Sequence, residues 1–268
     1  MKPLVLTLMH EPGQRLDLSP LVPHRLNGKN AKEIAAIELQ TTRETVTAGD
    51  VFKIRSGSAE SIRIEGGSER LDNIGQDMKS GEIVVEGDCG KCLGRNLSGG
   101  SVAALGDCGP YAGSCMSGGR LEIAGDAGSF LGAPLEGEIE GMSGGLLIVR
   151  GNAAGRAGDR MRRGTILIEG HAGDFAGSRM IAGTLIAVGG CGSLPGYLMR
   201  RGTIVLGASP ELAPTFADCG EHELAFAALF AGLLRPESRA AARLLGRPLR
   251  RFAGDMAALG KGEILLPC

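Results

Sequence analysis

One repeating pattern dominates the middle of this chain and restricts what the chain can fold into. Between Ser61 and Gly207, a short apolar run is followed by Gly-x-x-Gly-x-x-x-Gly, then a Met or Leu, then a glycine that precedes the next run. The pattern recurs about every nineteen residues. Its first glycine stands at Gly66, Gly87, Gly106, Gly125, Gly151, Gly170, Gly189 and Gly207. Two copies carry insertions, yet the spacing resumes after each, which is typical of a stacked repeat.

Three sets of apolar residues recur with the pattern and predict how each copy folds. The second and fourth residues of every apolar run are apolar, beginning with Ile62 and Ile64. Because they lie two apart, they point to the same face of a strand. The third set is Met78, Leu97, Met116, Met142, Met161, Met180 and Met199. A repeat this short buries such residues only by stacking on its neighbours, at a strand spacing of about 4.8 Å.

The repeat therefore predicts a mainly β protein, a right-handed parallel β-helix of about seven or eight coils by that strand spacing. Its glycines are expected to allow positive φ angles at the corners. We divide the chain into an N-terminal cap region (residues 1–60), the parallel β-helix (residues 61–207) and a C-terminal helical extension (residues 208–268). The cap is expected to cover the open strand edges of the first coil.

Shorter patterns predict the elements outside the repeat. Residues 4–8 alternate like a strand, residues 31–39 are compatible with a short helix, and residues 49–54 resemble one imperfect coil. In the C-terminal part, residues 221–234 and 237–245 have the apolar spacing of helices. Gly246 then marks a helix stop.

The third residue of each run should face outward, and four consecutive copies place an apolar residue there. These four residues, called the outer strip below, are Ile148, Leu167, Ile186 and Val205. A contiguous apolar strip should not remain in water. Two partners fit it: the C-terminal helices of this chain or a neighbouring protein of an assembly, and both can contribute. We therefore treat the strip as a candidate interface.

Composition and charge exclude several classes of function. The net charge of the 268 residues is −1, with 15 Lys/Arg against 20 Asp/Glu in residues 1–150 and 14 against 10 in residues 151–268. This charge balance and the lack of aromatic residues beside the arginines disfavour nucleic acid. No run of eighteen apolar residues and no basic-then-apolar N-terminal signal occurs. We expect a cytoplasmic protein that does not bind membranes.

A set of arginines is the strongest candidate binding site. Arg162 and Arg200 share one position of the repeat, and Arg163 and Arg201 share the next. Because each pair is two coils apart, its members should lie about 10 Å from each other on one ridge. Arg160 and Arg179 match at a third position. The ridge is either a solvated rim or a site for carboxylates of a partner or an acidic cofactor tail.

The cysteines favour a structural role over a metal or redox site. Cys89-Gly-Lys-Cys92 has the spacing of metal ligands. However, one position of the repeat is occupied only by small residues, namely Cys89, Cys108, Ala127, Ala153, Ala172 and Cys191. This predicts a ladder of small buried side chains in which cysteine acts as a small hydrophobe. With no secretory signal, reduced thiols are expected.

Motifs that would indicate catalysis have simpler explanations. Gly141-Met-Ser-Gly-Gly145 has the spelling of a hydrolase nucleophile elbow, but that motif requires a strand before it and a helix after it. Here it is the closing turn of a coil, so we do not expect Ser143 to be a nucleophile. The four histidines, His10, His24, His171 and His222, lack zinc-binding spacing and are expected in loops or on the surface. We therefore predict neither catalytic residues nor a metal site.

Taken together, these residues resemble a known family. The glycine repeat, the short N-terminal region and the motif Phe252-Ala-Gly-Asp followed by Gly-Lys-Gly-Glu263 resemble the C subunits of formylmethanofuran dehydrogenases. The chain looks closer to the C subunits of bacterial formyltransferase/hydrolase complexes, because it is rich in Ala and Arg and poor in Lys. The repeat alone is also similar to the C-terminal β-helix domain of the large chain of glutamate synthase.

The resemblance implies a role in one-carbon metabolism, in formaldehyde oxidation. Such a complex transfers a formyl group from formyl-tetrahydromethanopterin to methanofuran or an analogue, and releases formate. The family places the hydrolytic metal centre in the amidohydrolase-like A protein and transfer in the formyltransferase D protein. The C protein, with partners A, B and D, is then a non-catalytic scaffold without a cofactor of its own.

The resemblance leaves two alternatives for the identity of the chain and implies one binding site. The chain is alternatively the C protein of a redox formylmethanofuran dehydrogenase, or a glutamate-synthase-like β-helix module. An independent enzyme that uses the solenoid groove is disfavoured, since the clustered Asp, Lys or Arg with aromatics that sugar binding requires are lacking. Methanofuran-type carriers bear an acidic, glutamate-rich tail. The four arginines of the ridge are therefore expected to contact that tail or a neighbouring protein of the complex.

Overall fold

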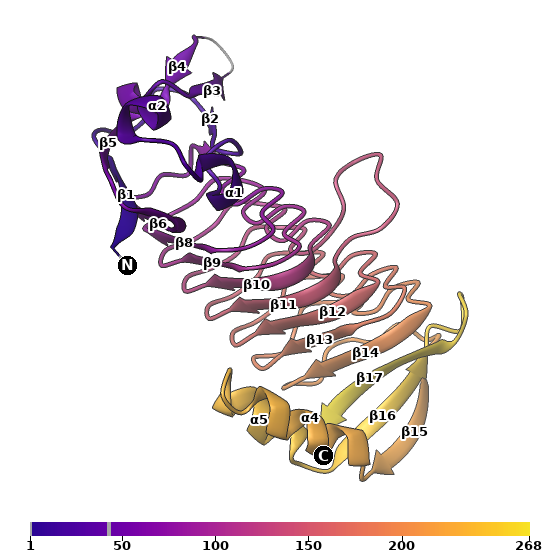
Figure 1. Ribbon diagram of the computed structural model, residues 1–268. Helices are drawn as coiled ribbons and strands as arrows, with labels where there is room; N and C mark the ends of the chain where they lie inside the picture. Colours follow the sequence, from indigo (N-terminus) through magenta and orange to yellow (C-terminus); the bar gives the residue numbers. More distant parts are fainter. Residues whose placement is uncertain (1, 42–43) are drawn as a thin grey trace.

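The computed structural model describes residues 2–41 and 44–268 and shows a mainly β protein with one long sheet (Figure 1). Within these residues the sheet has 13 strands, in the order β15-β16-β17-β14-β13-β12-β11-β10-β9-β8-β6-β1-β5. In chain order they are β1 Pro3–Leu8, β5 Phe52–Arg55, β6 Ser58–Glu65, β8 Glu82–Glu86, β9 Ser101–Ala104, β10 Ser117–Ile123, β11 Ser143–Val149, β12 Arg163–Ile168, β13 Thr184–Ala187, β14 Arg201–Leu206, β15 Ala217–His222, β16 Leu249–Gly254 and β17 Lys261–Pro267.

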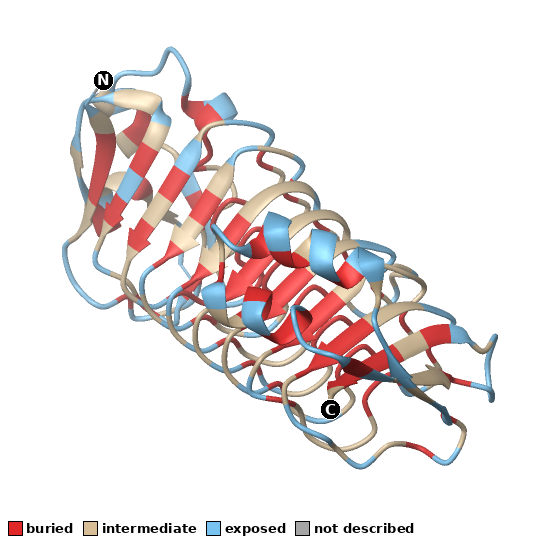
Figure 2. Cartoon of the chain, turned by 90° about the horizontal axis from the view of Figure 1, so that it is seen from below, coloured by how far each residue is buried: buried red, intermediate tan, exposed pale blue. Residues whose placement is uncertain are grey.

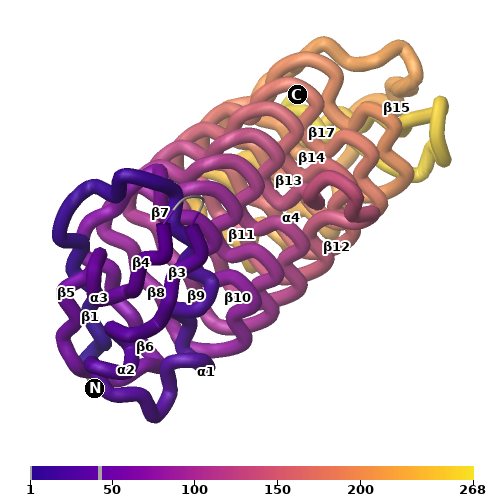
Figure 3. Tube along the Cα trace, turned by 90° about the horizontal axis from the view of Figure 1, so that it is seen from above, coloured from indigo at the N-terminus to yellow at the C-terminus, as the bar shows by residue number. Residues whose placement is uncertain are grey.

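The glycine repeat accounts for the central strands of this sheet. From β6 to β14, with β7 left out, each strand pairs in parallel with the following strand of the same sheet. The register joins equivalent repeat positions, so that Ile62 lies opposite Ile83, and Leu147 opposite Ile166. Figure 3 shows the backbone passing round the stack between successive strands. The predicted stacking of one strand per repeat is confirmed.

The interior of the stack is the main core of the molecule. The Met position of the repeat, from Met78 to Met199, is fully buried, as are Ile62 and Ile64. The small-residue ladder also forms, because single parallel bridges join Cys89 to Cys108 and so on to Cys191. Most of this ladder is buried, and Cys191 is half-buried. The predicted structural role of these cysteines as small core residues is therefore confirmed.

The corners of the coils contain the positive φ angles that the glycines predicted, but not at every glycine. Gly113 has a φ angle of +66°, and the equivalent glycines of the other coils have φ angles within about 10° of this value. At Gly125 no positive φ occurs; a Cβ atom there would instead collide with the carboxylate of Asp107 in the preceding coil. The first glycine of the repeat is thus explained mainly by close approach of neighbouring coils, which corrects the expectation.

The N-terminal region closes the first end of the core. Its described residues form three helices, α1 Pro23–Leu26, α2 Ala31–Ala35 and α3 Ala48–Val51, and three short strands, β4 Val46–Thr47, β3 Glu38–Thr41 and β2 Leu16–Asp17. These strands form a small sheet in that order, and β2 pairs with β7 Leu71–Asp72 of the stack. Buried leucines of this region, such as Leu16 and Leu39, belong to the same core as the stack. Arg15 fastens the region to the stack by a bidentate contact with Asp72, at 2.6 and 2.7 Å.

Three predictions about this region can be compared with the structure. The strand at residues 4–8 is confirmed as β1, which pairs in parallel with β6. The helix at residues 31–39 ends at Ala35, and β3 begins at Glu38. Residues 49–54 do not form a coil: Thr47 and Asp50 form a capping box that starts α3, and β5 then pairs antiparallel with β1. That prediction was wrong.

The C-terminal region is not purely helical, which corrects the prediction for residues 208–268. Besides α4 Ala225–Leu234 and α5 Arg239–Leu245, it contains β15, β16 and β17. The last of these pairs in parallel with β14 and places Ile264 opposite Ile204. The sequence from Gly262 to Leu266 repeats the glycine, polar and apolar order of Gly202 to Leu206, a signal that the sequence analysis missed. As predicted, α5 ends at Gly246.

The outer strip is covered by this chain's own helices. Ile148, Leu167, Ile186 and Val205 are all fully buried and share a second core with the inner residues of α4 and α5. Figure 2 shows both helices lying across these strands. Arg120 also pairs with Glu237, between the helices, at 2.8 Å. The prediction that C-terminal helices pack on the strip is confirmed. The strip itself is therefore not a surface that another protein can reach in this structure.

Candidate functional site

The four predicted arginines line one pocket. Arg163 and Arg201 begin β12 and β14, two coils apart, and Arg162 and Arg200 precede them. The intervening coil contributes Ile181 and Ala182, and the turn between β16 and β17 contributes Leu259. Together these residues enclose a surface pocket of about 310 Å³. Repeat spacing placed the arginines on one ridge, whereas only the tertiary structure brings Leu259 to it.

Most of the positive charge of the pocket has no acidic partner among the described residues. All four arginines are exposed. Arg162 pairs with Glu140 at 2.5 Å, but over residues 2–41 and 44–268 the side chains of Arg163, Arg200 and Arg201 have no ion pair or hydrogen bond. Lys261 lies opposite Arg201 in the register of β14 and β17 and adds a further exposed cation. Guanidinium groups that lack partners are suited to bind carboxylates, often bidentately.

The other two arginines of the repeat have a structural role instead. Arg179 donates from Nε and Nη2 to the two carboxylate oxygens of the buried Asp159, at 2.9 and 2.7 Å. Arg160 donates to the backbone carbonyl of Glu138 at 2.9 Å and lies 3.8 Å from Asp159. Both residues have positive φ angles at coil corners. Neither lines the arginine pocket, so this third repeat position does not extend the candidate site.

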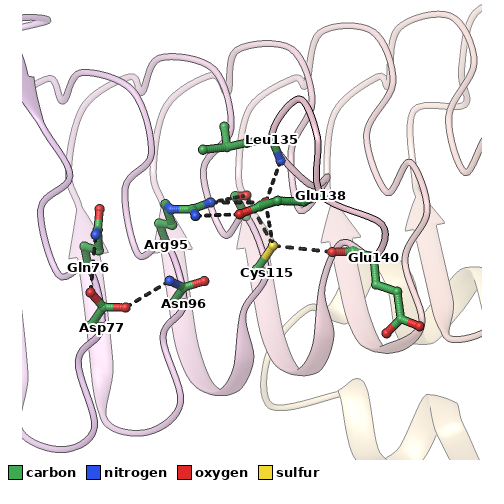
Figure 4. Close-up of polar contacts among 9 residues, drawn as sticks. Gln76, Asp77, Arg95, Asn96, Cys115, Leu135, Glu138 and Glu140 are labelled. Atoms are coloured by element: carbon green, nitrogen blue, oxygen red, sulfur yellow. Dashed lines mark hydrogen bonds and ion pairs between the residues drawn. The ribbon is translucent and has the colours of Figure 1, made fainter.

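A polar cluster that the sequence analysis missed holds the inserted loop between β10 and β11 (Figure 4). Glu138 on this loop accepts a hydrogen bond from Arg95 at 2.6 Å and one from the thiol of Cys115 at 3.0 Å. The backbone N–H of Leu135 donates to the same carboxylate at 2.8 Å. No repeat position contains Glu138, because the loop is an insertion, and so periodicity carries no signal for this cluster.

The cluster pairs an ionised carboxylate with a protonated thiol and contains no reactive thiolate. The Arg95 guanidinium, with the Cys115 and Leu135 donors, lowers the pKa of Glu138 to about 2, against the smaller opposing effect of burial. Burial and the neighbouring Glu138 carboxylate raise the pKa of Cys115 to about 11. At neutral pH the thiol is therefore protonated and donates to an ionised carboxylate. This arrangement fastens the loop and does not produce a nucleophilic thiolate.

The remaining cysteines and histidines do not assemble into a reactive site. Burial raises the pKa of Cys108 and Cys191 to about 12 and also raises that of Cys89. All four histidines are exposed, as predicted. Ser143 begins β11, so its glycine motif leads into a strand and not a helix. In the part of the chain that the structure describes, no three His, Cys, Asp or Glu residues are grouped to hold a metal ion.

No helix among the described residues has the length and apolar character needed to cross a lipid bilayer.

The chain is similar to a solved structure over nearly its whole length, and to curated proteins over about a third of its length. No family model matches it. It superimposes with a TM-score of 0.93 on a chain in the crystal structure of the formyltransferase/hydrolase complex from Methylorubrum extorquens in complex with methylofuran. That match has 43% sequence identity and covers 98% of this chain and 99% of the other.

Sequence alignment finds C subunits of related complexes, over shorter stretches of this chain. The C subunit of the formyltransferase/hydrolase complex of Methylorubrum extorquens is 44% identical over 80 residues, 30% of each chain. The C subunit of the tungsten-containing formylmethanofuran dehydrogenase 2 of Methanothermobacter thermautotrophicus is 35% identical over 99 residues, 35% of this chain and 37% of the other. In these alignments the chain spans about a third of the length of the curated relatives.

Proposed function

This chain belongs to the family formed by the C subunits of formyltransferase/hydrolase complexes, and on that premise we propose that it is the non-catalytic scaffold of such a complex. The single observation that supports the proposal most strongly is the match to a chain of that complex at 43% identity over 98% of this chain. At this identity and coverage, the whole fold is shared, and not only the glycine repeat. The proposed partners are the A, B and D proteins of the same complex.

The proposed architecture is a right-handed parallel β-helix. The parallel pairing of β6 to β14 in chain order supports it. We also propose that residues 1–60 act as a cap, residues 61–207 as the β-helix and residues 208–268 as a C-terminal extension. β17 modifies this division, because it adds one more parallel strand to the end of the stack. The scaffold presented to partners is therefore longer than the repeat itself.

The proposed reaction belongs to the complex and not to this chain. Formyl transfer from formyl-tetrahydromethanopterin to a methanofuran-type carrier is assigned to the formyltransferase partner, and release of formate to the metal centre of the amidohydrolase-like partner. The residues of this chain that we place in the assembly only position partners or carrier. Among the described residues of this chain, no three His, Cys, Asp or Glu side chains are grouped to hold a metal ion.

The arginine pocket fits the acidic tail of such a carrier. Arg163, Arg200 and Arg201 have no ion partner in the described parts of the chain, so carboxylates would not have to displace an existing contact. The apolar side chains of Ile181 and Leu259 between them suit the methylene groups of glutamate side chains. We propose that these arginines and Arg162 hold the tail, or the carboxylates of a neighbouring protein in its place.

Native mass spectrometry tests the scaffold proposal directly. The chain is isolated from its own cells through a mild affinity tag, together with whatever it binds. We expect an amidohydrolase-like protein and a formyltransferase in fixed ratio, and formyl-transferring and formate-releasing activity only in the assembly. A single chain of 27.6 kDa without partners would contradict the proposal.

A redox version of the complex is the second candidate. The matches to tungsten- and molybdenum-containing formylmethanofuran dehydrogenases favour it, although they cover about a third of this chain. Metal analysis of the purified assembly separates the two. Molybdenum or tungsten together with iron would indicate the dehydrogenase, and their absence with retained formate release would indicate the hydrolytic complex.

A further inference from the structure

Helix α4 has two apolar faces, and only one of them is covered. Its inner face, formed by Ala227, Ala231 and Leu234, is buried in the second core against the outer strip. On its outer face, Phe226 is 42% exposed and Leu229 and Leu233 are each 74% exposed. The ten residues of the helix include no charged side chain. A helix that is apolar all round is normally buried on all sides.

The spacing of the outer residues matches a docking stripe. Phe226, Leu229 and Leu233 stand at i, i+3 and i+7, which places them in one row along the helix. Beside this helix, a hollow of about 350 Å³ lies between the start of α4 and the end of α5, lined by Leu224, Ala228, Leu245 and Pro248 among others. A row of apolar side chains next to a hollow is a surface that a partner's apolar side chains can enter.

The charges around this face indicate the chemistry of the partner. Arg235, Arg239, Arg243 and Arg247 recur every four residues, are all exposed, and form no ion pair among the residues that the structure describes. Arg247 also lines the hollow, together with one acid, Glu223. The other acid in this segment, Glu237, is already engaged by Arg120 of the stack. Arginines flanking an apolar stripe complement a partner whose apolar groove has carboxylates at its rim.

We propose that the outer face of α4, with the arginine row from Arg235 to Arg247, is the surface on which another protein of the assembly docks. That protein presents an apolar groove with Asp and Glu residues along its edge. The inference rests on the proposed scaffold function. It names the face of the scaffold that a partner contacts. Because α4 and α5 cover the outer strip, a partner at this side of the sheet meets the helices and not the strip. Figure 2 shows the exposed side of both helices turned away from the strands.

An anionic membrane is the competing partner, because basic and apolar helices also bind lipid surfaces. A protein is favoured for two reasons. The exposed stripe is confined to one helix of ten residues, and the adjoining hollow of about 350 Å³ has room for a protein side chain. Membrane binding becomes one outcome of the test below.

The test uses the full chain produced together with the other proteins of its complex. Leu229→Glu/Leu233→Glu removes the stripe, and Arg239→Glu/Arg243→Glu reverses part of the row. Ile139→Glu is the matched apolar control, because Ile139 is 80% exposed on the inserted loop, far from α4 in sequence. Lys29→Glu/Lys53→Glu is the matched charge control, since both lysines are exposed. Thermal melting of each isolated chain confirms that the surface changes leave the fold intact.

Native mass spectrometry and the dissociation constant of the assembly are measured. We expect the stripe variant to weaken assembly at least about 100-fold and the row variant at least about tenfold, with both controls near wild type. If wild type assembles and the stripe variant assembles equally well, the docking face is overturned while the scaffold function stands. If wild type remains a single chain, the scaffold function and the docking face both fail.

A second measurement covers the case in which a variant folds poorly. Leu233→Cys is introduced into a chain that also carries Cys219→Ser and Cys268→Ser, which removes the two exposed thiols. We expect maleimide to label Cys at position 233 at least about tenfold more slowly in the assembly than in the isolated chain. Equal labelling in the two states overturns the proposal. The proposal is also overturned if the isolated wild-type chain cosediments with phosphatidylglycerol vesicles and the stripe variant does not.

Discussion

At the scale of single residues, the stack depends on backbone conformations that most side chains avoid. Each coil turns through positive φ angles, at a glycine such as Gly113 and also at bulkier residues such as Tyr111 and Phe130. None of the non-glycine residues with positive φ in the described chain is β-branched, in line with the steric cost of that combination. The rings of Tyr111 and Phe130 stack at 4.9 Å, so the strained corners also gain contacts between coils.

Gly113→Ala should destabilise the chain for two separate reasons. The left-handed backbone costs an L-residue about 1–2 kcal/mol, and the new Cβ would collide with a methyl group of the buried Leu147. We expect the free energy of unfolding to fall by about 2–4 kcal/mol, measured by denaturant titration. Gly13→Ala is the control, since nothing lies near a Cβ at Gly13 and no positive φ is required there. Equal effects of the two changes would refute this account of the corner.

The Glu138 cluster predicts a specific dependence of stability on pH. The carboxyl pKa is lowered to about 2 in the folded chain and is about 4.3 when unfolded. Its contribution to stability is therefore complete above about pH 4.3, and it is lost as the pH falls towards 2. Glu138→Gln should lower the free energy of unfolding at pH 7 by about 1–2 kcal/mol, a value reduced by partial exposure of the carboxylate.

The same variant should also flatten the pH profile. Melting temperatures between pH 7 and pH 2 are compared for wild type, Glu138→Gln and the exposed loop variant Glu136→Gln. Only the Glu138 change is expected to reduce the loss of stability between about pH 4 and pH 2. A wild-type-like profile for Glu138→Gln would show that the cluster does not hold the loop.

At the scale of elements, β17 joins the two ends of the C-terminal region. It pairs in parallel with β14 on one side and antiparallel with β16 on the other. Ile264 contributes to the interior of the stack and Leu265 to the core under α4 and α5, and both are fully buried. One strand from the end of the chain therefore closes the main core and supports the helices that cover the outer strip.

Removal of residues 261–268 should accordingly disrupt more than the last strand. Losing Ile264 and Leu265 from two cores costs at least about 4 kcal/mol, and the edge of β14 becomes open to pairing with other chains. We expect a lower melting temperature and self-association, measured by light scattering during size-exclusion chromatography. Deletion of the exposed Cys268 alone is the control and should change neither. A monomeric, stable truncated chain would argue against this role of β17.

At the scale of the whole molecule, two basic surfaces belong to the C-terminal half of the chain, whereas the N-terminal half is acidic. The arginine pocket lies at the start of β12 and β14, and the arginine row lies on the helices that cover the same region of the sheet. Residues 1–150 have more acidic than basic side chains, and residues 151–268 the reverse. Such polarity orients partners along a long scaffold.

Reversal of Arg162, Arg163, Arg200 and Arg201 to Glu tests the pocket within the assembly. Carboxylates of a tail or of a neighbouring protein would then face like charges, so we expect carrier retention or assembly to weaken at least about tenfold. Reversal of four exposed lysines, Lys2, Lys29, Lys32 and Lys53, makes the same change in net charge and should have little effect. Unchanged assembly mass and activity in the arginine variant would rule out the proposed contact.

The sequence by itself determined the features that depend on short-range periodicity. A period of about nineteen residues with strict apolar positions is enough to predict the stacking, the Met ladder, the small-residue ladder of Cys89 and Cys108, and the alignment of the arginines on one ridge. Each of these depends only on which positions coincide when identical coils are stacked, and a stack has no other long-range choice to make.

Only the tertiary structure decided the features that join segments far apart in the chain. Pairing of β17 with β14, burial of the outer strip by α4 and α5, and capture of Glu138 by Arg95 all connect residues without a shared repeat position. Periodicity gives no information about such contacts, because many placements of a flanking segment are equally compatible with the local sequence pattern of that segment. Packing against the completed stack selects one of them, and so the pocket acquires Leu259 and α4 presents its second apolar face.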